Sequence, residues 1–470
     1  MAFSHVRQPS LSQCVQLLPQ PVPKVVLLKS EHRLYLRLIS VTRQLLLPLT
    51  PCLTWREITS PIDRKSMQKV GIAGLGGFAS CHHQALLELE RESLLRVVAT
   101  CDPFHDRLPH VKQHFSLSER GVQLFEDLTG MMDNSELDWV SIATPLHLHA
   151  AMHRHCVEKR LPCYLEKPPT LDPWELEQMI ATDKGAAIKT QVGFAYLYEP
   201  ERISLKKRLL HGDFGRLTGV QVRGASRRGI SYYSRNAWAG RLKLDDHLIL
   251  DSCMGNGMAH HVHNVLFFAG TGAVASWADY RQVEAKLLRA NDIEGADTVF
   301  LRALLSPNVE MRLALTHACE QKLSIVERLI CENAIIEIHP RKRIEIRFRS
   351  GEVEDILFGE RDNLRENLRF FSDHVRMGAG TILGSLEHCR SFVEINALSY
   401  VSSQTIVTAC AREKHSEDAK EFWLIKDIEP MLDTFLVSGD FKDIPIDHSS
   451  PLPTSARDLR DGKSWNQFLR

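Results

Sequence analysis

Two segments of this chain carry side chains that could move a proton. In the first, Lys167 stands between Glu166 and a pair of prolines, and in the second, His260 follows Asn256 at helical spacing. A cation beside a reacting hydroxyl stabilises the alkoxide that develops there, and an imidazole exchanges protons near neutral pH. Side chains of these two types can therefore take part in proton transfer at a hydroxyl group. The alternative for Lys167 is an ion pair with Glu166 on a surface loop.

A glycine-rich loop offers a place for a dinucleotide. The apolar run 69–73 is followed at once by the pattern G-x-G-x-x-A. The residues of this loop that we assign to cofactor binding are Gly74, Gly76, Gly77, Phe78 and Ala79. Gly74 fits a tight turn, Gly76 lets a pyrophosphate approach the main chain, and Ala79 keeps the next helix close to the strand. The N-terminus of that helix would then face the phosphates.

A carboxylate ends the next predicted strand and bears on which cofactor fits. Asp102 follows the apolar run 96–101, where it could accept hydrogen bonds from the ribose hydroxyls of adenosine. The same charge would repel a 2′-phosphate, so we favour NAD, with NADP as the alternative because His105 and Arg107 are close in sequence. A second interpretation is that Asp102 only caps the turn before Pro103.

The segments that hold these residues alternate between strand and helix. Strands are predicted at 69–73, 96–101, 137–143 and 163–165, and helices at 85–91 and 150–159. The third strand leads into Thr144, Pro145 and His149, and the fourth into Glu166 and Pro168. This alternation predicts a doubly wound parallel sheet, the Rossmann arrangement, over residues 67–190.

Beyond residue 190 the pattern changes. Segments that alternate apolar and polar side chains lie at 217–222, 311–315, 335–338 and 344–348. They predict a second, α+β domain over 191–415, with a large, open and mostly antiparallel sheet. Apolar spacing predicts closing helices at 363–377 and 385–411. We interpret 416–470 as a tail that packs on a neighbour or remains mobile.

Composition narrows the possible partners. Lys plus Arg and Asp plus Glu are equal at 58 each, which gives no sign of nucleic acid or of an acidic membrane surface. The 11 cysteines form no CxxC pair, which favours reduced thiols and a cytoplasmic location. No apolar run approaches the ~18 to 20 residues that cross a bilayer.

Residues 1–66 differ from the rest of the chain. They are basic, proline-bearing and free of glycine, with no sustained helical or strand period. A transit peptide fits loosely, and a structured extra domain fits poorly. We favour the hypothesis that Met67 is the native start and that the preceding segment is disordered and dispensable.

Four features in order resemble the glucose–fructose oxidoreductase / inositol dehydrogenase / MocA (Gfo/Idh/MocA) family of NAD(P)-dependent oxidoreductases. They are the glycine loop at 74–79, Ile-Ala-Thr-Pro with a histidine at 142–149, Glu-Lys-Pro at 166–168, and the Gly- and His-rich segment near 255–264. The resemblance spans residues 67–415. It implies that Lys167 is the catalytic lysine, that Pro168 contacts the nicotinamide side, and that Tyr196 lines the cleft.

The resemblance also assigns roles around His260, with departures. His260 aligns with the family's histidine and becomes the general acid/base, while Asn256 and His263 take positions where the family has aspartates. Asn256 could orient a substrate hydroxyl but could not tune Lys167 by charge. An alternative register makes His261 catalytic and places Asn264 in the last position. A metal on these histidines is disfavoured, because neighbouring histidines on a helix point to different faces, so we predict none.

Other polar residues allow more than one interpretation. The loop 227–233, with Trp238 close behind, has the mixture found in sugar-binding loops and also in solvated ones. The remaining histidines that we considered are interpreted as surface or capping residues: His82, His83, His153 and His155.

The sequence thus favours hydride transfer between nicotinamide and a carbohydrate-like small molecule, which would be a sugar, a polyol or a related cyclic alcohol. Two alternatives remain open. One is an NAD-dependent glycosidase or lyase with transient oxidation, and the other is a non-catalytic nucleotide-binding regulator. An exposed face of the second sheet would favour a dimer or tetramer.

Overall fold

A computed structural model describes residues 67–378, 382–444 and 450–460. The interpretation of residues 1–66 falls outside these ranges, as does the end of the predicted tail.

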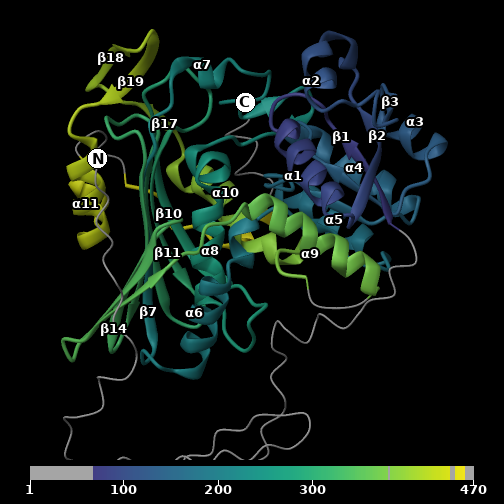
Figure 1. The fold of residues 1–470 in the computed structure, drawn as a ribbon. Helices are drawn as coiled ribbons and strands as arrows, with labels where there is room; N and C mark the ends of the chain where they lie inside the picture. The colour runs from purple at the N-terminus through teal and green to yellow at the C-terminus, as the bar shows by residue number, and fades with distance from the viewer. Residues whose placement is uncertain (1–66, 379–381, 445–449, 461–470) are drawn as a thin grey trace, which may run out of the picture. The chain divides into compact units, whose positions relative to one another are not determined.

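The first third of the described chain forms the predicted Rossmann domain (Figure 1). Its parallel sheet has the order β3-β2-β1-β4-β5-β6. The strands are β1 Gln68–Ala73, β2 Leu95–Cys101, β3 Gln123–Phe125, β4 Trp139–Ile142, β5 Cys163–Leu165 and β6 Gln191–Val192. The helices between them are α1 Ala79–Arg91, α2 Pro109–His114, α3 Leu128–Asn134, α4 His149–Glu158 and α5 Pro173–Asp183. Because β6 pairs with β5, this sheet extends past the predicted boundary at residue 190.

A helix from the C-terminal part of the chain completes this domain. α9 spans Asn363–Met377, as its apolar spacing predicts, and packs on α1. The ring of Phe371 contacts that of Trp139 at a centroid distance of 5.2 Å, and Leu368 is buried in the same cluster. The Rossmann core is therefore built from two distant segments of sequence.

The second domain is organised on a nine-stranded sheet. Its order is β16-β15-β14-β13-β7-β12-β11-β10-β17. The strands are β7 Leu217–Ala225, β10 Tyr280–Arg289, β11 Thr298–Leu305, β12 Val309–Thr316, β13 Ser324–Cys331, β14 Ala334–His339, β15 Arg343–Phe348, β16 Val353–Leu357 and β17 Ile406–Thr408. Neighbours are antiparallel except for β7–β12 and β10–β17, which confirms the predicted fold class.

Helices lie on both faces of this sheet. One face carries α6 Pro200–His211, α8 Ala259–Ala269 and α10 Arg390–Ser403. On the other face lies α11, Ile428–Ser438, as Figure 1 shows. Within the predicted helix 385–411, the structure has α10 followed by β17.

The region beyond residue 415 requires a correction. The hairpin of β18, Arg412–Glu417, and β19, Lys420–Ile425, leads into α11, whereas we expected a tail that packs on a neighbour or remains mobile. Phe435 of α11 packs against Phe300 of the sheet at a ring distance of 5.3 Å. Burial of this apolar helix face explains the difference. α11 thereby covers part of the sheet face that we expected to be free for oligomer contacts.

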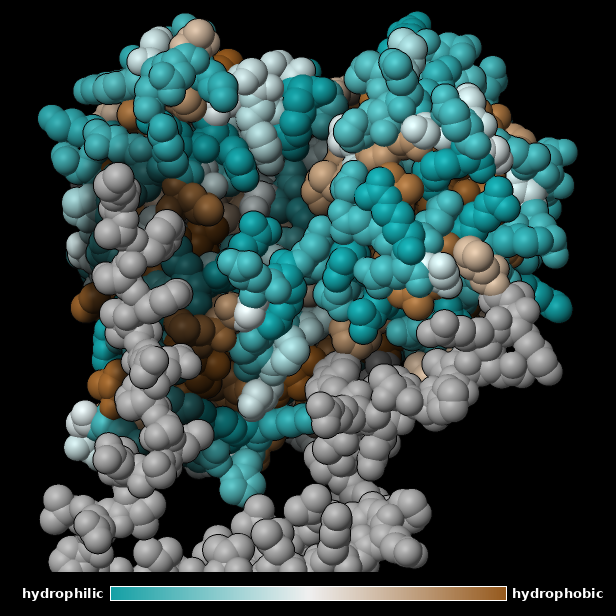
Figure 2. Space-filling model, in the orientation of Figure 1, coloured by the Kyte–Doolittle hydropathy of each residue, from teal (hydrophilic) through white to brown (hydrophobic). Residues whose placement is uncertain are grey.

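The surface reflects the two domains. In Figure 2 the surface of the Rossmann domain is mostly hydrophilic, while hydrophobic side chains gather over the nine-stranded sheet. In the described part of the chain, no helix combines the length and the apolar character that crossing a membrane requires.

Candidate active site

The glycine loop between β1 and α1 has the geometry that its sequence predicts. Gly74 has a φ of +106°, and a Cβ there would lie 2.7 Å from the main-chain oxygen of Ala143. Only glycine fits this turn. Gly77 also has a positive φ, of +56°, but a Cβ at Gly77 would meet nothing within 4 Å. The loop therefore leaves open space above its main chain, as a bound pyrophosphate would require.

Asp102 braces this loop. Its carboxylate accepts hydrogen bonds from the main-chain nitrogens of Leu75, at 3.1 Å, and Phe104, at 2.9 Å. The turn-capping interpretation is thus realised, and the carboxylate also lies beside the glycine loop. A role toward ribose stays a prediction.

A cavity of about 460 Å³, which we call the loop cavity, lies above the glycine loop. It gathers eight of the predicted cofactor residues: Gly76, Gly77, Phe78, Thr144, Pro145, His149, Glu166 and Pro168. Lys167 and Asn256 line it as well. Gly74, Ala79 and Asp102 are not part of its lining, because they shape and brace the loop.

His149 holds two loops of this cavity together. One ring nitrogen lies 3.0 Å from the main-chain oxygen of Thr144, and the other lies 3.0 Å from that of Pro168. Burial lowers the pKa of His149. Its side chain therefore positions the loops after β4 and β5.

Lys167 lies where the two domains meet. Its Nζ donates a hydrogen bond to the main-chain oxygen of Asn256 at 3.2 Å. Burial lowers the pKa of Lys167, against the opposing charges of Glu166 and Asp251. The surface ion pair is wrong, because the Glu166 carboxylate binds elsewhere. One of its oxygens accepts the main-chain N–H of Lys167 at 3.0 Å, and the other lies 3.1 Å from His82.

The position of His82 corrects our surface interpretation. His82 is fully buried, with Nδ1 2.8 Å from the hydroxyl of Ser141 and Nε2 against Glu166. His83 and His153 are buried too, and His153 lies 3.4 Å from Asp183. The sequence could not show this, because these side chains meet strands that are distant along the chain.

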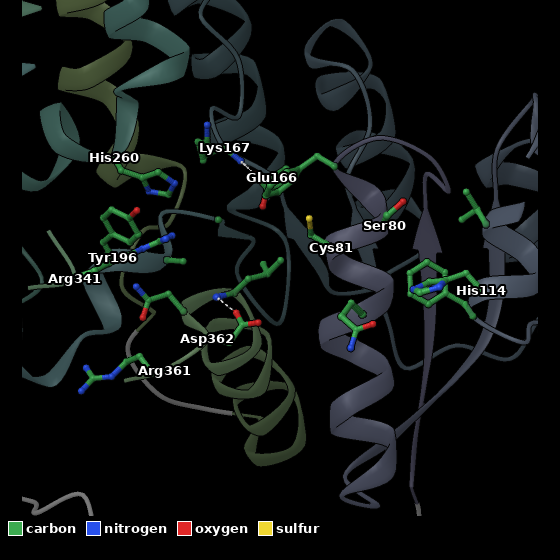
Figure 3. Close-up of a pocket in the computed structure, with 18 of the residues that line it drawn as sticks. Ser80, Cys81, His114, Glu166, Lys167, Tyr196, His260, Arg341, Arg361 and Asp362 are labelled. Atoms are coloured by element: carbon green, nitrogen blue, oxygen red, sulfur yellow. Dashed lines mark hydrogen bonds between the residues drawn. The ribbon is translucent and has the colours of Figure 1, made fainter. Parts of the chain in front are cut away.

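A larger cavity of about 1120 Å³, the main cavity, opens on the other side of Lys167. Figure 3 shows His260, Tyr196 and Arg341 on one side of it and Cys81 of α1 across from them. The His260 ring stacks on Tyr196 at a centroid distance of 4.6 Å. Burial and the charge of Lys167 lower the pKa of His260 well below its usual value, which favours the neutral imidazole and makes it a weaker base.

His261 serves a different purpose from His260. Its Nδ1 lies 2.7 Å from the carboxylate of Glu327, which also binds Arg202 and accepts a hydrogen bond from Asn264. All four residues are buried. His261 and Asn264, the residues of the alternative register, are therefore part of a buried polar network.

His263 is a correction. It is fully buried, stacks on Phe194 at 3.8 Å, and lies 3.1 Å from the main-chain oxygen of His388. It lines neither the loop cavity nor the main cavity, so the assignment to substrate binding is wrong. The physical reason is that α8 buries every residue except His260.

Asp251 is a residue of the site that the sequence did not predict. This buried carboxylate accepts the main-chain N–H of Gly240 at 2.6 Å. Burial raises its pKa to about 6, opposed by the charges of Arg235 and Lys167. Asp251 therefore supplies a negative charge near Lys167 that Asn256 cannot. The available signal was its position just before the Gly- and His-rich segment.

The fold and this site define a two-domain protein with a dinucleotide-type glycine loop and a Lys/His pair beside it. Residues 68–194 match the family described as "Oxidoreductase family, NAD-binding Rossmann fold", the Gfo/Idh/MocA family. The chain therefore carries the NAD-binding Rossmann domain of this family, as its motifs predict.

Individual relatives match about a third of this chain. Inositol 2-dehydrogenase 4 of Saccharopolyspora erythraea is 29% identical over 149 residues, which are 32% of this chain and 42% of that protein. The rhizopine catabolism protein MocA of Rhizobium meliloti is 25% identical over 149 residues, or 32% of this chain and 44% of that protein. The chain thus matches less than half the length of these curated relatives.

The fold is shared over a longer span. The WlbA dehydrogenase from Bordetella pertussis, solved in complex with NADH and UDP-GlcNAcA, superimposes with a TM-score of 0.58 at 17% identity. The match covers 72% of this chain and 97% of that structure. It therefore includes the nine-stranded sheet as well as the Rossmann domain.

Proposed function

We propose that this protein is an NAD-dependent oxidoreductase that acts on a hydroxyl group of a sugar, polyol or related cyclic alcohol. One observation carries the proposal: Lys167 lines both the loop cavity and the main cavity, and His260 faces the main cavity. A group held above the glycine loop and a substrate in the main cavity would therefore meet at Lys167.

The loop cavity fits a dinucleotide. Gly76 and Gly77 would face its pyrophosphate, and Thr144 and Pro168 would lie along it. Asp102 favours NAD over NADP by charge. When bound, nicotinamide supplies the acceptor or donor of a hydride.

The protein's own residues would handle the proton. Oxidation of an alcohol breaks its O–H bond, and a lysine with a lowered pKa can take that proton at Nζ. The carboxylates of Glu166 and Asp251 stabilise the resulting ammonium. His260 lies in the same cavity, and its imidazole can accept a hydrogen bond from a second hydroxyl of the substrate.

The test begins with binding. Melting temperature is measured with NADH and with NADPH at matched concentrations, because a ligand that binds only the folded state raises it. We expect a larger rise with NADH. Equal or absent shifts would contradict the cofactor assignment.

Turnover is measured next on a panel of sugars and polyols, by the absorbance of reduced nicotinamide. We expect Lys167→Met to lower turnover strongly while NADH still raises the melting temperature. Product without net reduction of NAD would indicate transient oxidation, and binding without any chemistry would indicate a regulator.

A further inference from the structure

A third cavity adjoins the main cavity on the side away from the glycine loop. This side cavity has a volume of about 370 Å³ and is lined only by residues of the second domain. Its polar lining includes Arg228, Ser324, His339, Arg341 and Lys342. Tyr196 and Arg341 line both the side cavity and the main cavity, so the two are continuous at these residues.

The side cavity is positively charged. Three of its lining residues are Arg or Lys, and none of those that the structure describes is Asp or Glu. The neighbouring arginines differ, because each of them is paired with carboxylates. Arg202 is neutralised by Glu199 and Glu327, and Arg361 by Glu201. Charges placed together without a counter-ion favour an anion at that place.

The three cations of this cavity differ in exposure, because Arg341 and Lys342 are exposed whereas the Nε of Arg228 is buried. Among the described residues, no hydrogen bond or ion pair joins the side chains of Arg341 or Lys342 to any protein group. The Nε of Arg228 is buried without a partner, and its guanidinium lies 5.0 Å from the Tyr232 ring centroid. A buried donor without an acceptor is costly, and an oxyanion would satisfy it.

Arg341 is held toward the cavity by an uncommon turn. The N–H of Lys342 donates to the main-chain oxygen of His339 at 3.0 Å, which closes the turn between β14 and β15. Arg341 itself has a φ of +61°, in the left-handed region that favours glycine. The chain thus has a long cationic side chain at a position where glycine would be less strained.

The turn also sets the distance from the side cavity to the Lys/His pair. The Arg341 guanidinium lies 5.8 Å from the ring centroid of Tyr196, and that ring stacks on His260 at 4.6 Å. Figure 3 shows the three side chains in sequence along one wall. One sugar ring with an exocyclic phosphate or carboxylate could reach from the pair to the cations.

We propose that the substrate carries an oxyanion, a phosphate or a carboxylate, which binds in the side cavity to Arg341, Lys342 and Arg228. Its reacting hydroxyl then faces Lys167 and His260. This inference rests on the proposed function and specifies the substrate class. The cofactor does not compete for these cations, because no residue of the glycine loop lines the side cavity.

The first experiment compares matched substrates on the full chain with saturating NAD. Glucose is compared with glucose 6-phosphate and glucuronate, and myo-inositol with an inositol monophosphate. We expect kcat/KM to be about tenfold or more higher for an anionic member of a pair than for the neutral one. Equal values throughout would overturn the inference and leave the proposed function standing.

The second experiment assigns the preference to residues. Arg341→Gly removes the cation and relieves the left-handed strain, so the variant should melt no lower than the wild type. We expect the anionic-to-neutral ratio of kcat/KM to fall about tenfold. Arg349→Ala is the matched control, since Arg349 is exposed and lines neither cavity. A ratio unchanged in Arg341→Gly would overturn the assignment.

Inorganic phosphate separates a substrate group from an effector. We expect it to compete with the anionic substrate. If free phosphate instead accelerates the neutral sugar, a separate effector binds there and the inference is wrong. If neither member of any substrate pair is turned over, calorimetry measures whether phosphate binds to the NADH-bound protein. Binding that is lost in Arg341→Gly supports the anion site, and no binding overturns it. The NADH shift in melting temperature reports on the proposed function independently.

Discussion

The amine of Lys167 donates its hydrogen bond to the main-chain oxygen of Asn256, across 3.2 Å. The contact ties the loop after β5 to the segment that leads into α8, and so joins the two domains at the site. Because the acceptor is a main-chain atom, the side chain at position 256 is not needed to hold the lysine. This explains how asparagine can stand where the resemblance implies an aspartate.

Lys167→Met should lower turnover by about 10²- to 10⁴-fold, the range for loss of a general acid or base. NADH should bind within a few-fold of its wild-type affinity, because only one side chain of the loop cavity changes. The matched control is Lys159→Met, which removes an exposed lysine paired with Asp133. Equal losses in the two variants would contradict a specific role for Lys167.

Asp251 makes stability depend on pH. Its pKa is raised from an ordinary value of 3.8 to about 6, so the folded state binds more protons than the unfolded state between these values. The free energy of unfolding therefore falls as pH rises through this window. Asp251→Asn lacks the group, so its stability relative to wild type should rise by about 3 kcal/mol between about pH 4 and about pH 7. Urea unfolding at several pH values measures this difference, and a pH-independent difference would refute it.

The same variant should alter the pH profile of catalysis. The Asp251 carboxylate raises the pKa of Lys167, so its removal should let Lys167 lose its proton at lower pH. If Lys167 acts as a base, the acidic limb of the kcat/KM profile should move to lower pH in Asp251→Asn. A profile that does not move would show that Asp251 affects stability alone.

His260 and His261 should respond oppositely to the same change. His260→Gln should cost less than about 1 kcal/mol of stability, since Nδ1 of His260 has no partner among the described residues, and should reduce turnover strongly. His261→Gln should destabilise the fold by about 1 to 3 kcal/mol, because it weakens the buried Glu327 network. Denaturant unfolding measures the stability of both variants, and steady-state kinetics measures their turnover. The reverse pattern would favour the alternative register.

Local pattern was enough to predict much of the fold. The strand at 69–73 and the glycine loop behind it follow from composition and from the φ that Gly74 must adopt. The helix at 363–377 follows from the spacing of Leu364, Leu368 and Phe371. The packing of this helix on α1 could not be predicted in the same way, because it is a contact between segments that are distant along the sequence.

The site was predictable only in part, for a similar reason. Lys167 and His260 were found through motifs, whereas His82 was missed because Ser141 and Glu166 come from other strands. Helical spacing grouped His263 with His260, yet α8 is buried on nearly every side, so spacing could not separate cavity from core.

The two positive-φ glycines of the loop offer a last paired test. In Gly74→Ala the new methyl would lie 2.7 Å from the oxygen of Ala143, and the φ of +106° is unsuited to alanine. We expect a loss of more than about 2 kcal/mol in stability. Gly77→Ala meets open space, so it should cost only about 1 kcal/mol, the left-handed penalty.

That open space is where the pyrophosphate would lie, so Gly77→Ala should weaken NADH binding beyond its small effect on folding. Urea unfolding and NADH fluorescence titration measure the two effects. Wild-type NADH affinity in Gly77→Ala would mean that no phosphate approaches the loop there.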